Sequence, residues 1–178
     1  MTDEVRQLVD RQAILDCVVN CARGMDRHDP ELFASAYHPD ALDDHGPYRG
    51  TAAGFIEHVN GSDDDEGVHG RLFRTHQHLV LNHFVELDGD EAHGETHFLF
   101  FGALRAAPTI QVTGGRYVDR FERRDGRWAM AARRVVMEWM TELPDTGDAN
   151  AATLSAFTRG AWDRSDISYQ RPLQVREG

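Results

Sequence analysis

The chain has 178 residues, of which 40% are hydrophobic and 28% charged, and its formal net charge is −11. This composition is typical of one soluble globular domain that is long enough to bury a core. The acidic balance argues against nucleic acid or an anionic membrane as a partner, because both require clustered Lys and Arg.

The N-terminal segment leads directly into helix-like sequence. It has no basic region followed by an apolar one, so we expect no signal peptide. No apolar run approaches the roughly 18 residues that a membrane-spanning helix needs. Cys17 and Cys21 lie four residues apart on one predicted helix, which favours reduced cysteines in a cytoplasmic protein over a disulfide framework. No second Cys/His pair has the spacing of zinc ligands, so we expect no metal site there.

The first part of the chain is predicted to be helical. Apolar residues recur near the helical period over residues 3–25, and Gly24 should weaken or end that helix close to Asp26. Asp29-Pro30 predicts an N-cap and first position of a short helix that runs through Tyr37. The next predicted elements, in chain order, are a short strand and turn over 40–50, a helix over 51–59 and a charged, glycine-rich loop over 61–70.

Alternating apolar and polar residues follow from His76 onward, with turn residues between the runs. They predict four strands, over 76–87, 91–106, 110–124 and 127–140. A short helix near 149–158 and a polar arm follow. Helices followed by a hairpin meander imply an α+β domain, with the helices packed on one face of an antiparallel sheet.

Several short motifs occur in a characteristic order. They are Gly24-Met25-Asp26, Asp29-Pro30-Glu31-Leu32-Phe33, Tyr37-His38-Pro39-Asp40-Ala41, His78-x-x-x-Asn82 and the segment from Tyr117 to Trp128. Together they resemble the SnoaL-like and NTF2-like proteins of the cystatin-like α+β barrel superfamily, which includes nuclear transport factor 2 and scytalone dehydratase. The resemblance implies a cone-shaped α+β barrel in residues 1–145. Residues 146–178 would form a C-terminal helix and arm, belonging to the same domain or contacting another subunit.

The resemblance also implies a catalytic group. Members such as hexachlorocyclohexane dehydrochlorinase and bile-acid 7α-dehydratase use an Asp–His dyad assisted by an arginine, and these residues fall on Asp26, His78 and Arg133. A histidine is suited to take a proton from carbon near neutral pH, and a carboxylate can orient it and stabilise its charged form. Some relatives have a tyrosine or lysine where this chain has Cys21, five residues before the aspartate.

Each of these residues also has a structural interpretation. His78 could be a strand histidine satisfied by backbone or water, Asp26 a helix-terminal aspartate bonded to its own backbone, and Arg133 a surface residue. His76 shares the strand face of His78, which invites a metal interpretation. Asn82 stands where such a site would need a carboxylate, so we expect no metal.

The alternation of the strands predicts which residues line a pocket. If His78 faces inward, Asn82 and Phe84 do so as well. The resemblance places Phe98, Phe100 and Tyr117 inward on the following strands, and alternation from Arg133 places Met137 inward. The predicted substrate-binding residues are Cys21, Asn82, Phe98, Phe100, Tyr117 and Met137. Such a lining suits a small, apolar, cyclic ligand.

The resulting hypothesis is a cofactor-free, dehydratase-like lyase. Two alternatives remain open at this point: an isomerase or polyketide-cyclase-type enzyme with the same dyad, and a non-catalytic binding subunit such as the small subunit of a ring-hydroxylating dioxygenase. An exposed apolar sheet face would need cover, which favours a homo-oligomer, with a trimer expected over a dimer.

Overall fold

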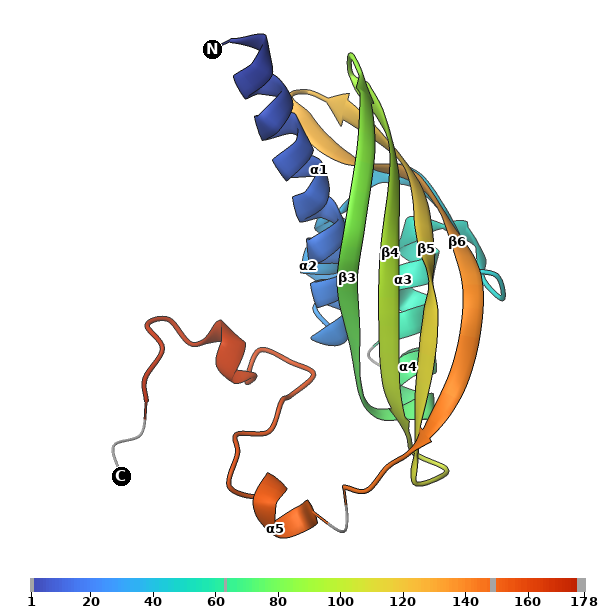
Figure 1. Ribbon diagram of the computed structural model, residues 1–178, viewed down its shortest axis with the longest axis vertical. Helices are drawn as coiled ribbons and strands as arrows, with labels where there is room; N and C mark the ends of the chain where they lie inside the picture. Colours follow the sequence, from blue (N-terminus) through green and yellow to red (C-terminus); the bar gives the residue numbers. More distant parts are fainter. Residues whose placement is uncertain (1, 63, 148–149, 176–178) are drawn as a thin grey trace.

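The computed structural model describes residues 2–62, 64–147 and 150–175. Figure 1 shows the helices beside one long, curved sheet, with a C-terminal arm that leaves it. The elements are, in chain order, α1 (Asp3–Asp26), α2 (Pro30–Ser35), β1 (Tyr37–Asp44), β2 (Arg49–Thr51), α3 (Ala52–Asn60), α4 (Gly67–Leu72), β3 (Phe73–Asp88), β4 (Glu91–Leu104), β5 (Thr109–Arg124), β6 (Arg127–Pro144) and α5 (Ala151–Leu154), before a 3₁₀ turn at Ile167–Tyr169.

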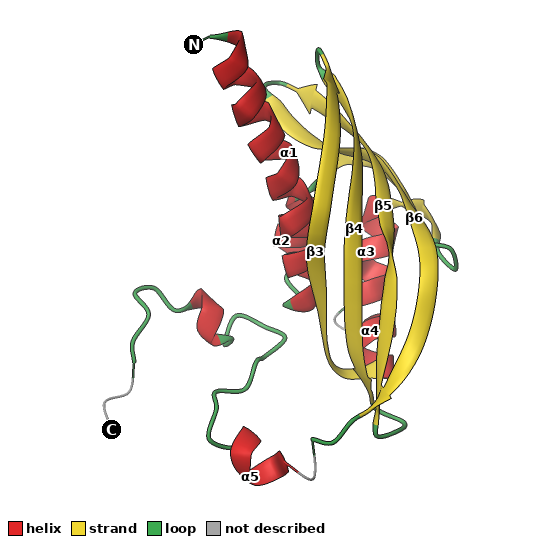
Figure 2. Cartoon of the chain, in the orientation of Figure 1, coloured by secondary structure: helices red, strands yellow, loops and turns green. Residues whose placement is uncertain are grey.

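The six strands form one sheet in the order β2-β1-β6-β5-β4-β3. Strand β1 runs parallel to β6, and the remaining neighbours are antiparallel. The sheet bends around α3 and α4 while α1 lies along β3 (Figure 2). The prediction of an α+β fold with N-terminal helices on a curved, mostly antiparallel sheet is confirmed.

The helices begin at residues whose side chains cap them. Thr2 Oγ1 accepts a hydrogen bond from the Val5 N–H at 3.4 Å, and Asp29 Oδ1 accepts one from the Leu32 N–H at 3.0 Å. Helix α1 ends at Asp26, close to the predicted position, and Gly24 lies in its last turn. Gly24 allows close packing, since a Cβ at this position would lie 2.5 Å from the Phe33 backbone nitrogen.

Three predicted boundaries were wrong. Helix α2 ends at Ser35, and Tyr37 already belongs to a strand. The segment 61–70 contains the start of α4, which carries two glycines and a histidine, so packing rather than helix propensity forms it. The helix expected near 149–158 is the shorter α5, and residue 149 of that range lies outside the described residues.

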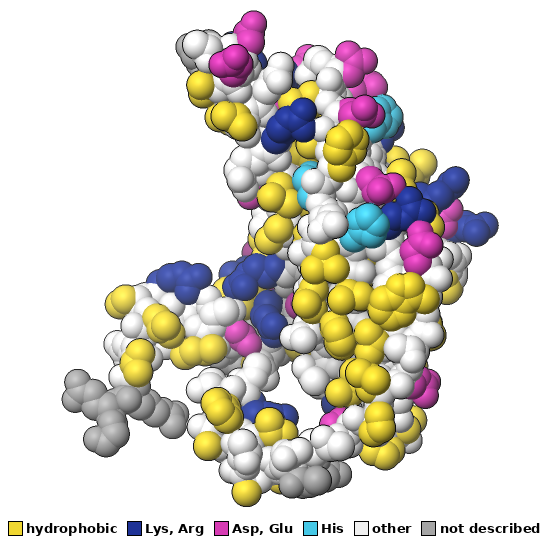
Figure 3. All heavy atoms as spheres, viewed as in Figure 1, with side chains coloured by type: hydrophobic (Ala, Val, Ile, Leu, Met, Phe, Trp, Pro, Cys, Tyr) yellow, Lys and Arg dark blue, Asp and Glu magenta, His cyan; other side chains and the backbone are white. Residues whose placement is uncertain are grey.

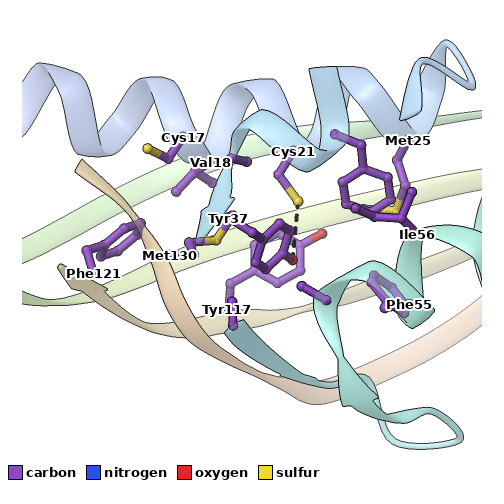
Figure 4. Packing of buried hydrophobic residues seen from close by; sticks show 14 of the residues in the cluster. Cys17, Val18, Cys21, Met25, Tyr37, Phe55, Ile56, Tyr117, Phe121 and Met130 are labelled. Atoms are coloured by element: carbon purple, nitrogen blue, oxygen red, sulfur yellow. Dashed lines mark hydrogen bonds between the residues drawn. The ribbon is translucent and has the colours of Figure 1, made fainter. Parts of the chain in front are cut away.

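The core fills the space between α1 and the sheet. Figure 4 shows the α1 side chains Cys17, Val18 and Cys21 facing Phe121 and Met130 of the sheet. Cys17 and Cys21 are free thiols and both are buried. Burial raises the pKa of each thiol to about 11, so they are neutral core residues near pH 7.

The C-terminal arm returns to the end of α1 (Figure 1). The Tyr169 hydroxyl donates to Asp29 Oδ2 at 2.7 Å, and Arg23 Nη2 donates to Ser168 Oγ at 3.1 Å. The Trp162 ring stacks on His28 with a centroid distance of 4.2 Å. The arm therefore covers the region where α1 ends and α2 begins.

The surface retains many apolar side chains. Figure 3 shows them gathered over the lower part of the sheet, and exposed large apolar residues on the strands include Phe84, Val118 and Trp139. In the part of the chain that the structure describes, none of the helices combines the length and apolar character that crossing a membrane requires.

Candidate active site

The last residue of α1 meets strand β3 through hydrogen bonds. Asp26 Oδ1 lies 2.7 Å from His78 Nδ1, and Asp26 Oδ2 accepts a hydrogen bond from the His78 backbone N–H at 2.8 Å. Because an ionised carboxylate can only accept, the Nδ1 atom of His78 must carry the proton. The remaining ring nitrogen, Nε2, then carries the lone pair.

A second histidine holds the same carboxylate. His76 Nδ1 lies 3.3 Å from Asp26 Oδ1, and both residues are buried. Burial alone raises the pKa of the Asp26 carboxyl, but the hydrogen bonds from His76 and His78 outweigh it and hold that pKa well below its usual range. Asp26 is therefore ionised at any physiological pH.

The hydrogen-bonded group extends to His28. His28 Nε2 lies 3.4 Å from His76 Nε2. Since His76 uses its Nδ1 proton for Asp26, its Nε2 accepts and His28 donates. Burial, reinforced by repulsion from His76 when that ring is protonated, lowers the pKa of His28 to about 4, and burial also lowers the pKa of His76. Both imidazoles are neutral near pH 7.

His78 lines a cavity of about 320 Å³ between the sheet and helices α3 and α4. Its wall is mainly apolar and aromatic, and it contains four of the six predicted substrate-binding residues, Phe98, Phe100, Tyr117 and Met137. The Phe98 and Tyr117 rings stack at 4.4 Å, and the Phe100 ring lies 4.8 Å from that of His78. The volume is in the range of small-ligand sites.

Two predicted site residues lie behind this wall. Arg133 makes a bidentate ion pair with Asp119, with two hydrogen bonds of 2.8 Å, and its Nη1 donates to Cys21 Sγ at 3.1 Å. The guanidinium carbon lies 4.0 Å from the centroid of the Tyr117 ring. Arg133 and Cys21 therefore support the cavity wall and are absent from the residues that line it.

The prediction for Asn82 was wrong. The pairing of β3 with β4 shifts by one residue between Val80 and His83, which reverses the inward and outward sides beyond that point. Asn82 is exposed, Phe84 is 62% exposed, and Val85 is buried in their place.

Three histidines of the cavity were missed by the sequence analysis. His45 follows β1, His58 lies on α3 and His69 lies on α4, and all three line the cavity. Burial lowers the pKa of His45 and holds that of His69 well below its usual range. The spacing of these histidines in the sequence does not indicate a shared site, because three separate segments of the fold bring them together.

The group of Asp26, His76 and His78 also has the composition of a metal site. One donor atom from each residue lies within 4.8 Å of the others, and two imidazoles with a carboxylate form a donor set that zinc accepts. The same atoms already satisfy one another at 2.7 Å and 3.3 Å. A metal would have to displace these hydrogen bonds.

A larger hollow of about 540 Å³ lies over the outer side of β1, β5 and β6. Its charged side chains are engaged with one another: Asp44 pairs with Arg49 at 3.1 Å and with Arg134 at 3.2 Å. These ion pairs occupy the charged groups of the hollow, and neither Asp26 nor His78 is among the residues that line it.

Comparison with known proteins agrees with this architecture of helices on a curved sheet. Residues 6–134 match the model of the SnoaL-like domain, and the chain belongs to that family. No curated protein matches the sequence.

Solved structures resemble the fold closely. LinA is 23% identical with a TM-score of 0.72, covering 80% of this chain and 95% of that chain. The hexachlorocyclohexane dehydrochlorinase LinA-type3 from Novosphingobium barchaimii is 24% identical with a TM-score of 0.70, covering 79% and 94%. A scytalone dehydratase-like protein from Novosphingobium aromaticivorans is 20% identical with a TM-score of 0.64, covering 76% and 88%. At these identities the likeness establishes the shared fold.

Proposed function

We propose that this protein is a cofactor-free lyase of the dehydratase type, which acts on a small, cyclic, largely apolar substrate. The observation that carries the proposal is the 2.7 Å contact between Asp26 Oδ1 and His78 Nδ1 at the wall of an apolar cavity. It leaves the lone pair on His78 Nε2, the arrangement a general base needs.

The reaction would begin at a C–H bond beside the leaving group. His78 Nε2 takes the proton, the C–H electron pair forms the new carbon–carbon double bond, and the leaving group departs with its bonding pair. Asp26 stabilises the imidazolium that forms. Two of the similar structures carry names that denote eliminations, a dehydrochlorinase and a dehydratase-like protein, which supports this class of reaction.

The residues around the dyad would bind the substrate. Phe98, Phe100, Tyr117 and Met137 offer the apolar contacts of the cavity wall. Arg133 would act from behind Tyr117, as a fixed positive charge near the site. Because Arg133 already donates two hydrogen bonds to Asp119, fewer of its N–H groups remain for a direct contact with a leaving group.

Proton abstraction can be tested without knowing the substrate. A cyclic ketone such as 2-tetralone exchanges its α-protons in D₂O, and NMR follows the exchange. We expect the protein to accelerate it and His78→Ala and Asp26→Asn each to lower the accelerated rate by roughly 10²- to 10⁴-fold. The exposed His97→Ala is the matched control. Both variants retaining the wild-type rate would remove the dyad from the mechanism.

The same first step also begins an isomerisation or a ring closure. Product analysis separates these reactions, because an elimination releases a leaving group whereas an isomerisation conserves the mass of the substrate.

We also propose a homo-oligomer, with a trimer favoured. Exposed apolar side chains such as Phe84, Val118 and Trp139 support it, since patches of this kind commonly mark contacts between subunits. Light scattering after size-exclusion chromatography would measure the mass, and a monomer would contradict the proposal.

A further inference from the structure

A second histidine–aspartate pair lies beside the same cavity, and its histidine, His45, lines the cavity. His45 Nδ1 is 2.6 Å from Asp43 Oδ1, and the Tyr37 hydroxyl donates to Asp43 Oδ2 at 2.7 Å. The Asp43 side chain is completely buried, whereas the His45 side chain is 22% exposed. The carboxylate is thus held from behind by a tyrosine and presents a histidine to the cavity.

The His45 ring is fixed in direction as well as position. It stacks on Phe55 with a centroid distance of 4.0 Å and an interplanar angle of 22°. Its backbone N–H donates to the Tyr48 carbonyl at 2.9 Å, which anchors the loop after β1. Stacking and two hydrogen bonds together leave the ring little rotational freedom.

The hydrogen-bond pattern determines the tautomer. Because Asp43 accepts from Nδ1, the neutral ring has its lone pair on Nε2. Among the described residues, no side chain or backbone group bonds to that nitrogen, and it is not among the fully buried, unpartnered atoms. Burial lowers the pKa of His45, so the ring remains a neutral acceptor near pH 7.

We infer that His45 is a specificity residue, which accepts a hydrogen bond from a hydroxyl group on the cyclic ligand. An apolar wall surrounds this acceptor nitrogen, so a bound ligand deprives it of water. A ligand hydroxyl placed there replaces the water with one oriented hydrogen bond. The ligand class is then a hydroxylated ring, phenolic or alcoholic, in place of a plain hydrocarbon. This inference rests on the proposed ligand-binding function of the cavity, but it assigns no role in proton abstraction.

The test compares two probes that differ by one hydroxyl group, 2-naphthol and naphthalene. Their dissociation constants are measured for the wild type, for His45→Phe and for His58→Phe. His45→Phe removes the acceptor and keeps a ring against Phe55, whereas His58→Phe makes the same change at a cavity histidine that has no carboxylate partner among the described residues.

We expect the ratio of the naphthalene constant to the naphthol constant to fall about 3- to 10-fold in His45→Phe, which is the worth of one hydrogen bond. The ratio should stay within about twofold in His58→Phe. An unchanged ratio in His45→Phe, an equal fall in His58→Phe, or no binding of naphthol to the wild type would each overturn the inference. If His45→Phe fails to fold, His45→Leu takes its place.

A second readout reports on the nitrogen itself. Binding of 2-naphthol should shift the ¹⁵N resonance of His45 Nε2 and binding of naphthalene should not, with the resonance assigned by its loss in the His45 variant. A resonance unaffected by naphthol would also overturn the inference. Because neither probe needs to react, these results are independent of whether Asp26 and His78 catalyse exchange.

Discussion

Arg133 and Asp119 form an ion pair that is almost completely removed from solvent, with 1% and 0% of their side chains exposed. Removing one partner leaves a buried charge without compensation. We therefore expect Asp119→Ala to lower the free energy of unfolding by about 3–5 kcal/mol. Urea denaturation would measure this loss. The exposed pair Arg49–Asp44 supplies the control, because Arg49→Ala should cost no more than about 1 kcal/mol. Equal losses of unfolding free energy in the two variants would contradict the burial of the Arg133–Asp119 ion pair.

The dyad makes a prediction that NMR can check without a substrate. In the wild type, His78 should be protonated on Nδ1 and carry its lone pair on Nε2, since Asp26 accepts from Nδ1. Asp26→Asn presents an amide, which can also donate, and the preference for this tautomer should weaken. Long-range ¹H–¹⁵N correlation spectra distinguish the two tautomers. The exposed His97 should give the same spectrum in both proteins, and a His78 signal unchanged by the substitution would argue against the contact.

Stability should depend on pH through the buried histidines. The pKa of His28 falls from 6.5 to about 4, and the pKa values of His69 and His76 are also lowered, so the unfolded chain binds more protons than the folded one between these values. Their stabilising contribution is complete above pH 6.5 and is lost as the pH falls toward 4. The depressed pKa of Asp26 keeps its own contribution intact over this window.

Urea denaturation at several pH values across this window measures the effect. His28→Phe keeps a ring against Trp162 but cannot titrate, so the proton uptake on unfolding should fall by up to about one proton. A free energy of unfolding that stays constant between pH 6.5 and 4 would show that these histidines are not buried as neutral groups.

Capping residues and turn residues mark the ends of several helices and strands in the sequence. Thr2 and Asp29 cap the helices that follow them, and Asp125-Gly126 forms the turn between β5 and β6 with positive φ angles of 52° and 78°. The facing of residues on the strands was predictable as far as strict alternation holds. The family resemblance placed Phe98 and Tyr117 on the inner side, and both line the cavity.

Shifts in strand register could not be predicted from the alternation of residues. A regular hairpin at Asp125-Gly126 would place Asp119 opposite Ala132, but the register shifts between Arg120 and Phe121 and pairs Asp119 with Arg133. The buried ion pair follows from this one-residue shift, as the exposure of Asn82 follows from another. Neither bulge has a sequence signature, because an extra residue in a strand resembles its neighbours.

The junction between α1 and α2 depends on Gly24. A Cβ there would lie 2.5 Å from the Phe33 nitrogen, so Gly24→Ala should force the two helices apart. The strain should exceed the gain in helix propensity, with a net loss of about 1–2 kcal/mol in the free energy of unfolding. Val19→Ala, at an exposed position of the same helix, should change stability by no more than about 0.5 kcal/mol. A neutral Gly24→Ala, measured by thermal or urea denaturation, would contradict this packing.

Metal ions distinguish an orienting dyad from a metal centre. If Asp26 serves to orient His78, dialysis against EDTA should leave the exchange of 2-tetralone unchanged. Added Zn²⁺ should inhibit it, because the ion would compete for the same Nδ1 and carboxylate atoms. His76→Phe removes one of the three donors, so the same inhibition should require at least about tenfold more Zn²⁺. Loss of exchange after EDTA treatment, restored by Zn²⁺, would instead assign these residues to a catalytic metal.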